Sequence, residues 1–210
     1  MAVTEVTGAL PGELLARLRD ARTPPAAFRS ASAALATLVL AEALRDLEGS
    51  PGRVRTPLAS AGVTRLARRV TLVPILRAGL ALLEPALALL PEGTRVGFLG
   101  MARDEQTLDP SLYVERLPAD LDRDDVVALD VMIATGGSAV RALDAIAVAR
   151  PASVRLVGLV SAPEGLARVA GSHPDVPITV AAVDERLDER GFIVPGLGDA
   201  GDRLYGESAT

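Results

Sequence analysis

The chain has 210 residues, 49% of them hydrophobic and 2% aromatic, so one domain with a core of Ala, Leu and Val is expected. Its net charge of −5 argues against a general nucleic-acid-binding protein, and the lack of cysteine excludes disulfides, thiolate catalysis and zinc–thiolate sites. All 22 basic residues are arginine, which excludes Schiff-base chemistry and the lysine-dependent Walker loop, while the single His173 argues against a histidine triad or metal cluster.

The N-terminal region, residues 1–50, is predicted to be helical. Its apolar residues recur every three to four positions, as Leu35, Leu38 and Val39 do, which is typical of an amphipathic helix. Gly49-Ser50-Pro51-Gly52 is a strong helix breaker. The expected helices are 12–20 and 26–48. Because so few aromatic residues are available, we also expect an Ala/Leu face of the second helix to be covered by a partner subunit.

Beyond residue 50, short apolar runs alternate with helical patterns. The expected strands are 70–75, 95–101, 125–129, 154–161 and 178–183. The expected helices between them are 80–90, 137–149 and 163–171. This alternation predicts an α/β fold, with a mostly parallel central sheet and helices on both faces. No internal repeat or linker is visible, so residues 1–210 are expected to form a single domain.

No membrane or export segment is predicted. The apolar run 78–90 is interrupted by Glu84 and Pro85 and is far shorter than a membrane span. Residues 1–11 include Glu5 and no basic residue, so no secretory signal is visible. We therefore expect a soluble, cytoplasmic protein without membrane or nucleic-acid partners.

The strand at 125–129 leads into the most informative motif of the chain. The strand ends in a carboxylate, and the chain then passes through a glycine-containing loop into a helix, which is typical of a phosphate cradle. Asp130 is placed to hold hydroxyls or a metal ion beside that phosphate. The simpler alternative is a tight strand-to-helix turn, but the full nine-residue pattern favours a ligand site. The candidate residues are Asp130, Val131, Met132, Ile133, Ala134, Thr135, Gly136, Gly137 and Ser138.

Two arginines are predicted at the same edge of the sheet. Arg77 follows the strand 70–75, and Arg103 opens a long polar segment, 103–118, that is predicted to be irregular. Ligands of such sheets bind beyond the carboxyl ends of the strands, so both arginines would face anionic groups there. The alternatives are a solvent-facing arginine at a helix start and an ordinary solvated loop. The more specific hypothesis for the long segment is an active-site lid that carries an arginine.

The C-terminal segment 191–202 contains four glycines and one proline and is predicted to be too irregular for a helix or a long strand. An ordinary terminal loop is one interpretation. Against it, glycines allow backbone groups to approach a flat ligand closely, and Asp199 offers a carboxylate there.

Taken together, these segments resemble the uracil phosphoribosyltransferases. The resemblance runs from about Leu18 to Gly206, is loose before residue 70, and is most specific to the uracil branch at 191–202. It implies a phosphoribosyltransferase-like fold with an irregular C-terminal base-binding hood at 184–206. The matching stretches are 73–80, Arg103 with the loop that follows it, 130–138, 162–165, 173–175 and 191–206.

The resemblance implies transfer of phosphoribosyl from PRPP (5-phosphoribosyl 1-diphosphate) to N1 of uracil, giving UMP and diphosphate in pyrimidine salvage. Mg²⁺ would arrive with PRPP, held mainly by substrate oxygens and water rather than by a protein metal site. A GTP activator and a homodimer or higher homo-oligomer are also implied, although no GTP site can be located in the sequence.

Roles in that reaction carry over residue by residue. Residues 134–138 would cradle the 5′-phosphate, and Asp130 would hold the ribose hydroxyls. Uracil would be read by the main chain of Ile193, Gly198, Asp199 and Ala200. The expected catalytic residues are Arg77 and Arg103, which would bind the diphosphate, and Asp199, which would lie close to both substrates.

The chain departs from the family pattern at three places. Val131 stands where proline is common, Ala102 stands where tyrosine is usual, and the N-terminal region lacks a His-Pro-Leu start. The change at Ala102 puts the behaviour of the lid or the oligomer contacts in question. None of these departures removes a group with an expected chemical role.

Three alternatives remain at this stage. The first is an enzyme that uses PRPP with another base, and the 191–202 segment argues against it. The second is a nucleotide-sensing regulator that kept the pocket but lost turnover, and the intact Asp130, Arg77, Arg103 and Asp199 argue against it. The third is a soluble α/β domain without phosphate chemistry, which leaves four ligand-like loops at one sheet edge unexplained.

Overall fold

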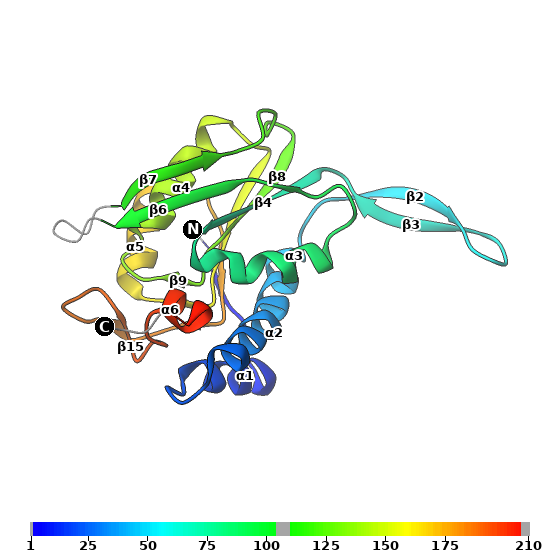
Figure 1. The fold of residues 1–210 in the computed structure, drawn as a ribbon. Helices are drawn as coiled ribbons and strands as arrows, with labels where there is room; N and C mark the ends of the chain where they lie inside the picture. The colour runs from blue at the N-terminus through cyan, green and yellow to red at the C-terminus, as the bar shows by residue number, and fades with distance from the viewer. Residues whose placement is uncertain (1, 104–109, 207–210) are drawn as a thin grey trace.

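A mostly parallel central sheet runs through the computed structural model, which describes residues 2–103 and 110–206 (Figure 1). Neighbouring strands of the sheet are parallel except β6 and β7, which are antiparallel. β5 (Arg95–Val96) pairs with β4 beside the main path. The order along that path is β1 (Val3–Glu5), β12 (Ile178–Val180), β10 (Ser153–Val157), β8 (Asp124–Leu129), β4 (Arg69–Leu76), β6 (Phe98–Arg103) and β7 (Pro110–Arg116).

Helices cover both faces of this sheet, which confirms the predicted architecture. Because successive strand residues point to opposite faces, Val127 and Leu129 pack in one apolar cluster, and Val126 and Ala128 pack in another. The first cluster contains residues of α1, α2, α3 and α6, and the second contains residues of α4 and α5. The helices are α1 (Ala9–Arg19), α2 (Pro25–Ala43), η1 (Ala78–Leu82), α3 (Leu83–Leu89), α4 (Gly137–Val148), α5 (Pro163–Ser172) and α6 (Ala200–Tyr205).

Three strands of the central sheet continue into a second, smaller parallel sheet. Its order is β13 (Ala182–Val183), β11 (Val160–Ser161) and β9 (Met132–Ile133). The predicted strands 154–161 and 178–183 are therefore each two short strands separated by a bend. At one bend, the Leu159 N–H leaves the main ladder and donates to the Val131 carbonyl at 3.0 Å. This second layer forms the base of the loop that follows β8.

Helix α2 ends at Ala43, earlier than the predicted residue 48. At this end of the helix, Arg155 Nη1 of β10 donates to the Ala43 carbonyl and to Asp46 Oδ1, the latter at 2.6 Å. α2 is long and apolar enough to cross a bilayer, but its apolar face, including Leu35 and Val39, is buried in the core, as in a core helix of a soluble protein. Ala27, Ala34 and Ala41 of the same helix are exposed, so the expected contact with a partner subunit stays a prediction.

A hairpin of β2 (Gly49–Arg55) and β3 (Ser60–Leu66) was not predicted, because its glycines and proline were read only as a helix breaker. Half-buried and exposed residues alternate along β2, which is the periodicity of a strand. The hairpin reaches away from the body of the molecule as a long arm (Figure 1). Leu58 at its tip is 94% exposed.

The prediction of an irregular segment at 103–118 is wrong for its second half. β7 pairs antiparallel with β6, from Phe98 opposite Arg116 to Arg103 opposite Pro110. The alternation of half-buried Leu112 and Val114 with exposed neighbours is the signal that was missed. Residues 104–109 lie outside the described residues, so the lid remains a prediction.

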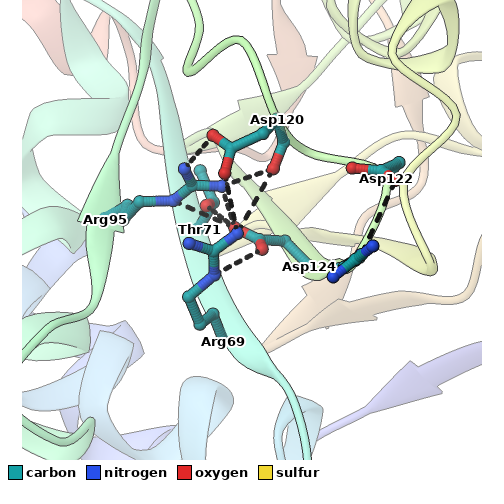
Figure 2. Close-up of polar contacts among 7 residues, drawn as sticks. Arg69, Thr71, Arg95, Asp120, Asp122 and Asp124 are labelled. Atoms are coloured by element: carbon teal, nitrogen blue, oxygen red, sulfur yellow. Dashed lines mark hydrogen bonds and ion pairs between the residues drawn. The ribbon is translucent and has the colours of Figure 1, made fainter.

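A cluster of charged residues lies at the edge of the sheet where β4, β5 and β8 begin, which we call the entry edge (Figure 2). The fully buried Asp124 carboxylate accepts from Thr71 Oγ1 at 2.5 Å, from Arg69 Nε at 3.1 Å and from Arg95 Nη2 at 2.5 Å. Hydrogen bonds from Arg95 and then Arg69 also lower the pKa of Asp120 to about 2. The cluster joins three strands and the loop before β8 through one carboxylate.

We expect Asp124→Ala to lower the free energy of unfolding by about 3 kcal/mol, because two arginines and a threonine lose a buried acceptor. Asp122→Ala is the matched control, since Asp122 is largely exposed and lies 4.0 Å from Arg123. The control should change stability by less than about 0.5 kcal/mol. Urea unfolding followed by circular dichroism measures both variants, and equal losses would contradict the role given to Asp124.

Candidate functional site

The predicted site residues that follow β4 and β8 lie at one edge of the sheet. These strands are parallel and in register from Arg69 opposite Asp124 to Pro74 opposite Leu129, so their carboxyl ends point the same way. Gly79 brings the two following loops into contact, since a Cβ at this position would lie 2.4 Å from the Leu129 carbonyl oxygen. The loops that carry Arg77 and Asp130 are therefore neighbours.

The loop 130–138 has the geometry of an anion cradle. Gly136 has a φ of 74° and is the N-cap of α4, and no side chain caps this helix end. The N–H groups of the first turn of α4 are thus not occupied by a side-chain cap, and the helix dipole adds partial positive charge there. The loop encloses a small hollow of about 40 Å³. Its lining comprises Asp130, Met132, Ile133, Ala134, Thr135, Gly136, Gly137, Ser138 and Ala139.

This loop is supported from behind by the start of α5, a contact that sequence reasoning did not assign. A Cβ on Gly165 would lie 2.3 Å from the Ala134 carbonyl oxygen, and one on Gly136 would lie 2.6 Å from the Gly165 carbonyl oxygen. Both positions therefore require glycine because two backbones meet there. The only sequence signal was the family-like stretch 162–165.

Asp130 is a buried carboxyl at the base of the cradle, 9% exposed. Burial raises the pKa of Asp130 to about 7, although the amides of Met132 and Val131 donate to the carboxylate and partly offset that rise. The group is therefore poised to change its charge near neutral pH. Its ionised form can accept hydrogen bonds from ligand hydroxyls.

The structure also brings Arg77 and Asp199 together, although they are far apart in the sequence. A Cβ built on Gly201 would lie 3.2 Å from Asp199 Oδ1 and 3.8 Å from Arg77 Nη2. The Tyr205 hydroxyl donates to the Arg77 carbonyl at 3.2 Å, which ties α6 to the turn after β4. A cationic and an anionic group thus share one exposed part of the edge.

The segment predicted to be irregular, 191–202, is partly regular. β14 (Arg186–Leu187) and β15 (Ile193–Val194) form a short antiparallel pair, and α6 begins at Ala200. The prediction that this segment holds no helix is wrong, since Asp199 is an N-cap whose side chain accepts from the Asp202 N–H at 3.0 Å. Glycine density concealed that signal.

The hood, residues 184–206, rests on the same core as the cradle. Ile193, Leu197 and Ala200 are buried in the cluster that contains Val131, whereas Gly198 and Asp199 are exposed. Of the predicted site residues, Arg103 is the exception: it is the last residue of β6, and its side chain lies outside the described part of the structure.

A larger hollow lies elsewhere. It measures about 820 Å³ and is found at the entry edge, beside the charged cluster of Figure 2. Arg69 and Asp120 line it but already pair with each other at 3.0 Å. The size of a hollow therefore does not identify the site. The opposite edge, at the carboxyl ends of β4 and β8, is the exit edge, and it brings together the cradle, a carboxylate and an arginine.

The chain is similar in sequence to known proteins of one family. A sequence model of the family described as uracil phosphoribosyltransferase matches residues 9–207. A uracil phosphoribosyltransferase of Thermus thermophilus is 47% identical over 207 residues, covering 98% of this chain and 99% of the relative. One from Leifsonia xyli is 48% identical over 195 residues, covering 91% and 92%.

Solved structures show the same fold. A protein from Aquifex aeolicus is 39% identical with a TM-score of 0.93, and the match covers 99% of this chain and 100% of that one. A hypoxanthine-guanine phosphoribosyltransferase from Bacillus anthracis matches with a TM-score of 0.50 at 12% identity, over 74% of this chain and 78% of its own. This second likeness concerns the fold alone.

We expect Asp130→Asn to raise the free energy of unfolding by roughly 2–4 kcal/mol at pH 8. The native carboxyl holds its proton up to about pH 7, but the unfolded one loses it near pH 4, so ionisation opposes folding as pH rises between these values. The gain should vanish below pH 4, where both states are protonated. Urea unfolding from pH 4 to 8 measures it, and identical pH profiles for wild type and variant would contradict the buried-acid assignment.

Proposed function

The chain belongs to the uracil phosphoribosyltransferase family, and we propose that the exit edge of its sheet carries out that family's reaction. The protein is a pentosyltransferase that joins the phosphoribosyl group of PRPP to N1 of uracil, giving UMP and diphosphate in pyrimidine salvage. The observation that supports this location is the meeting of the uncapped cradle at 134–138 with Asp130, Arg77 and Asp199.

In this proposal the cradle binds the 5′-phosphate of PRPP. The N–H groups at the start of α4 and the hydroxyls of Thr135 and Ser138 donate to phosphate oxygens, and Asp130 accepts from the ribose hydroxyls. A ligand that carries both a phosphate and neighbouring hydroxyls matches this pair of features better than a simple anion does.

Arg77 and Arg103 bind the diphosphate, and Asp199 faces the reacting carbon. The C1′–O bond breaks with its electron pair on the departing diphosphate as the N1–C1′ bond forms, and the N1 proton of uracil passes to solvent. Negative charge grows on the leaving group while C1′ becomes cation-like, so the arginines stabilise one change and the Asp199 carboxylate stabilises the other. Exclusion of water by a closed lid would prevent hydrolysis at C1′.

Uracil is read by the main chain of the hood. Its O4, N3–H and O2 alternate along one edge, and carbonyl and N–H groups at Ile193, Gly198 and Ala200 offer complementary acceptors and donors. Cytosine would reverse part of that pattern and leave buried polar groups without partners.

The donor set suits an Mg²⁺ ion that enters with PRPP. Among the described residues no group of three His, Cys, Asp or Glu side chains is arranged as a metal site, so substrate oxygens and water would supply most ligands. Asp130 and Asp199 are the carboxylates near enough to assist. The ion would neutralise diphosphate charge when bound.

The direct test is UMP formation from PRPP and Mg²⁺ with uracil, cytosine, hypoxanthine or orotate in parallel. Product with uracil alone is expected. Product with another base would reassign the hood, and PRPP binding without any product would indicate a nucleotide sensor instead. Adding GTP to the uracil reaction tests the predicted activation.

We further propose that the protein is a cytoplasmic homo-oligomer. The support is the β2–β3 arm, which extends from the body and presents Leu58 to solvent (Figure 1). A second copy packed on the arm would cover the half-buried residues that alternate along β2. Analytical ultracentrifugation should show a dimer or larger species, and a monomer at micromolar concentration would reject the proposal.

We expect Arg77→Ala to raise the KM for PRPP roughly 10- to 100-fold, because charge-assisted bonds to the diphosphate are lost. The KM for uracil should change little. Arg123→Ala, an exposed arginine at the opposite edge, is the control and should leave both constants unchanged. Steady-state kinetics with each substrate varied in turn decides the matter; equal effects on the two KM values would contradict the diphosphate assignment.

We expect Asp199→Asn to lower kcat by about 100-fold or more, since its negative charge no longer faces C1′. Stability should hardly change, because asparagine is as good an N-cap for α6 as aspartate. Thermal unfolding and kcat are measured on the same preparation. A kcat close to that of the wild type would remove Asp199 from the mechanism.

A further inference from the structure

One charged pair outside the proposed substrate contacts holds the main chain of the hood. Arg19, the last residue of α1, forms a two-pronged ion pair with Asp184, with Nη2–Oδ1 at 2.5 Å and Nη1–Oδ2 at 3.1 Å. Asp184 Oδ2 also accepts from the Gly196 N–H at 2.8 Å, and Arg19 Nη1 donates to the Gly196 carbonyl at 3.4 Å. The ion pair therefore forms hydrogen bonds with both the N–H and the carbonyl of Gly196 in the hood.

The pair is well suited to act as a fixed anchor. The Asp184 side chain is 4% exposed and the Arg19 side chain 26%, so water competes little for these bonds. Asp184 follows β13, a strand of the second sheet, and Arg19 ends a helix that packs on the core. The anchor thus connects Gly196 to two rigid parts of the molecule.

Gly196 in turn fixes a group proposed to read uracil. It has a φ of 59°, and a Cβ on it would lie only 2.1 Å from the Ile193 carbonyl oxygen. Its backbone therefore packs directly against that carbonyl, and a shift of Gly196 would displace it. Gly198, the next expected uracil contact, lies two residues further along the same loop.

The outer side of this loop faces a hollow of about 390 Å³, whose lining includes Arg19, Gly196 and Gly198 as well as the apolar Pro195 and Leu197. Hydrogen bonds therefore add to apolar contacts in holding the loop on this side. Arg203 adds a second tie, because its Nη1 donates to the Leu197 carbonyl at 2.9 Å.

We propose that Arg19 and Asp184 are positioning residues for base recognition, which set the place of the Ile193 carbonyl and of the Gly198 main chain through Gly196. The proposal rests on the proposed function, since it requires the hood to bind uracil. Neither residue touches a substrate in this arrangement. Their loss should therefore affect the binding of uracil and leave the binding of PRPP at the cradle intact.

The test is steady-state kinetics of Arg19→Ala, Asp184→Asn and the double variant, with each substrate varied in turn. Each single variant should raise the KM for uracil about tenfold, as expected for losing a charge-assisted anchor, with the KM for PRPP within about twofold of wild type. The KM for uracil of the double variant should be no higher than that of the more impaired single variant, because both residues act through Gly196. Arg17→Ala is the control: it lies on the same helix in an exposed pair with Glu13 and should behave as wild type.

If the pair were merely structural, the variants would have a lower melting temperature and higher KM values for both substrates, and that result would overturn the proposal. An unchanged KM for uracil would overturn it too. If Arg19→Ala does not fold, Asp184→Asn decides alone: its amide oxygen can still accept from the Gly196 N–H, whereas the charge and the second acceptor for Arg19 are lost. Hydrogen exchange of the peptides covering 192–199 should rise in the variants and not in Arg17→Ala. A wild-type enzyme that makes no UMP would reject the proposed function instead, so the two failures are distinguishable.

Discussion

The parallel pairing of β4 with β8 is the constraint on which the rest of the structure depends. At the entry end, the Asp124 carboxylate of β8 accepts from Thr71 and Arg69 of β4, so a shift of register would leave a buried charge without its partners. At the exit end, Gly79 lies against the Leu129 carbonyl. The turn with Arg77 and the loop with Asp130 are therefore held side by side by groups at both ends of the same two strands.

Around that pair of strands, the site divides into two parts with different kinds of support. The phosphate cradle rests on close backbone contacts, such as that between Gly136 and Gly165, and on the second parallel sheet. The hood packs Ile193, Leu197 and Ala200 on the apolar core. Its main chain is also bound by the charged side chains of Arg19, Asp184 and Arg203. In the proposed function, the first part binds the phosphate and the second part reads the base, so the two tasks fall to separately supported segments.

Sequence reasoning located the cradle because its signal is local: an apolar run, Asp130 and a glycine pair stand within one short stretch. It also gave the alternation of strands and helices, and hence the architecture. The β2–β3 arm and β7 were missed because Gly, Pro and charged residues masked a two-residue alternation in strands with exposed faces. The pairing of Arg19 with Asp184 could not be predicted, since 165 positions separate them and no local pattern links the two residues. The role of the Arg103 side chain stays a prediction.

The dependence of the hood on α1 has a consequence for how the protein is made. Arg203 donates to the Asp20 carbonyl at 2.7 Å, and Arg29 donates to the Leu204 carbonyl at 2.6 Å, so segments at opposite ends of the fold bind each other. The ribosome releases α1 and the cradle long before residues 193–205. The loop 130–138 is therefore synthesised well before the segment that completes the hood. In the proposed function, the part that reads the base would form only when residues 193–205 dock on the α1 region.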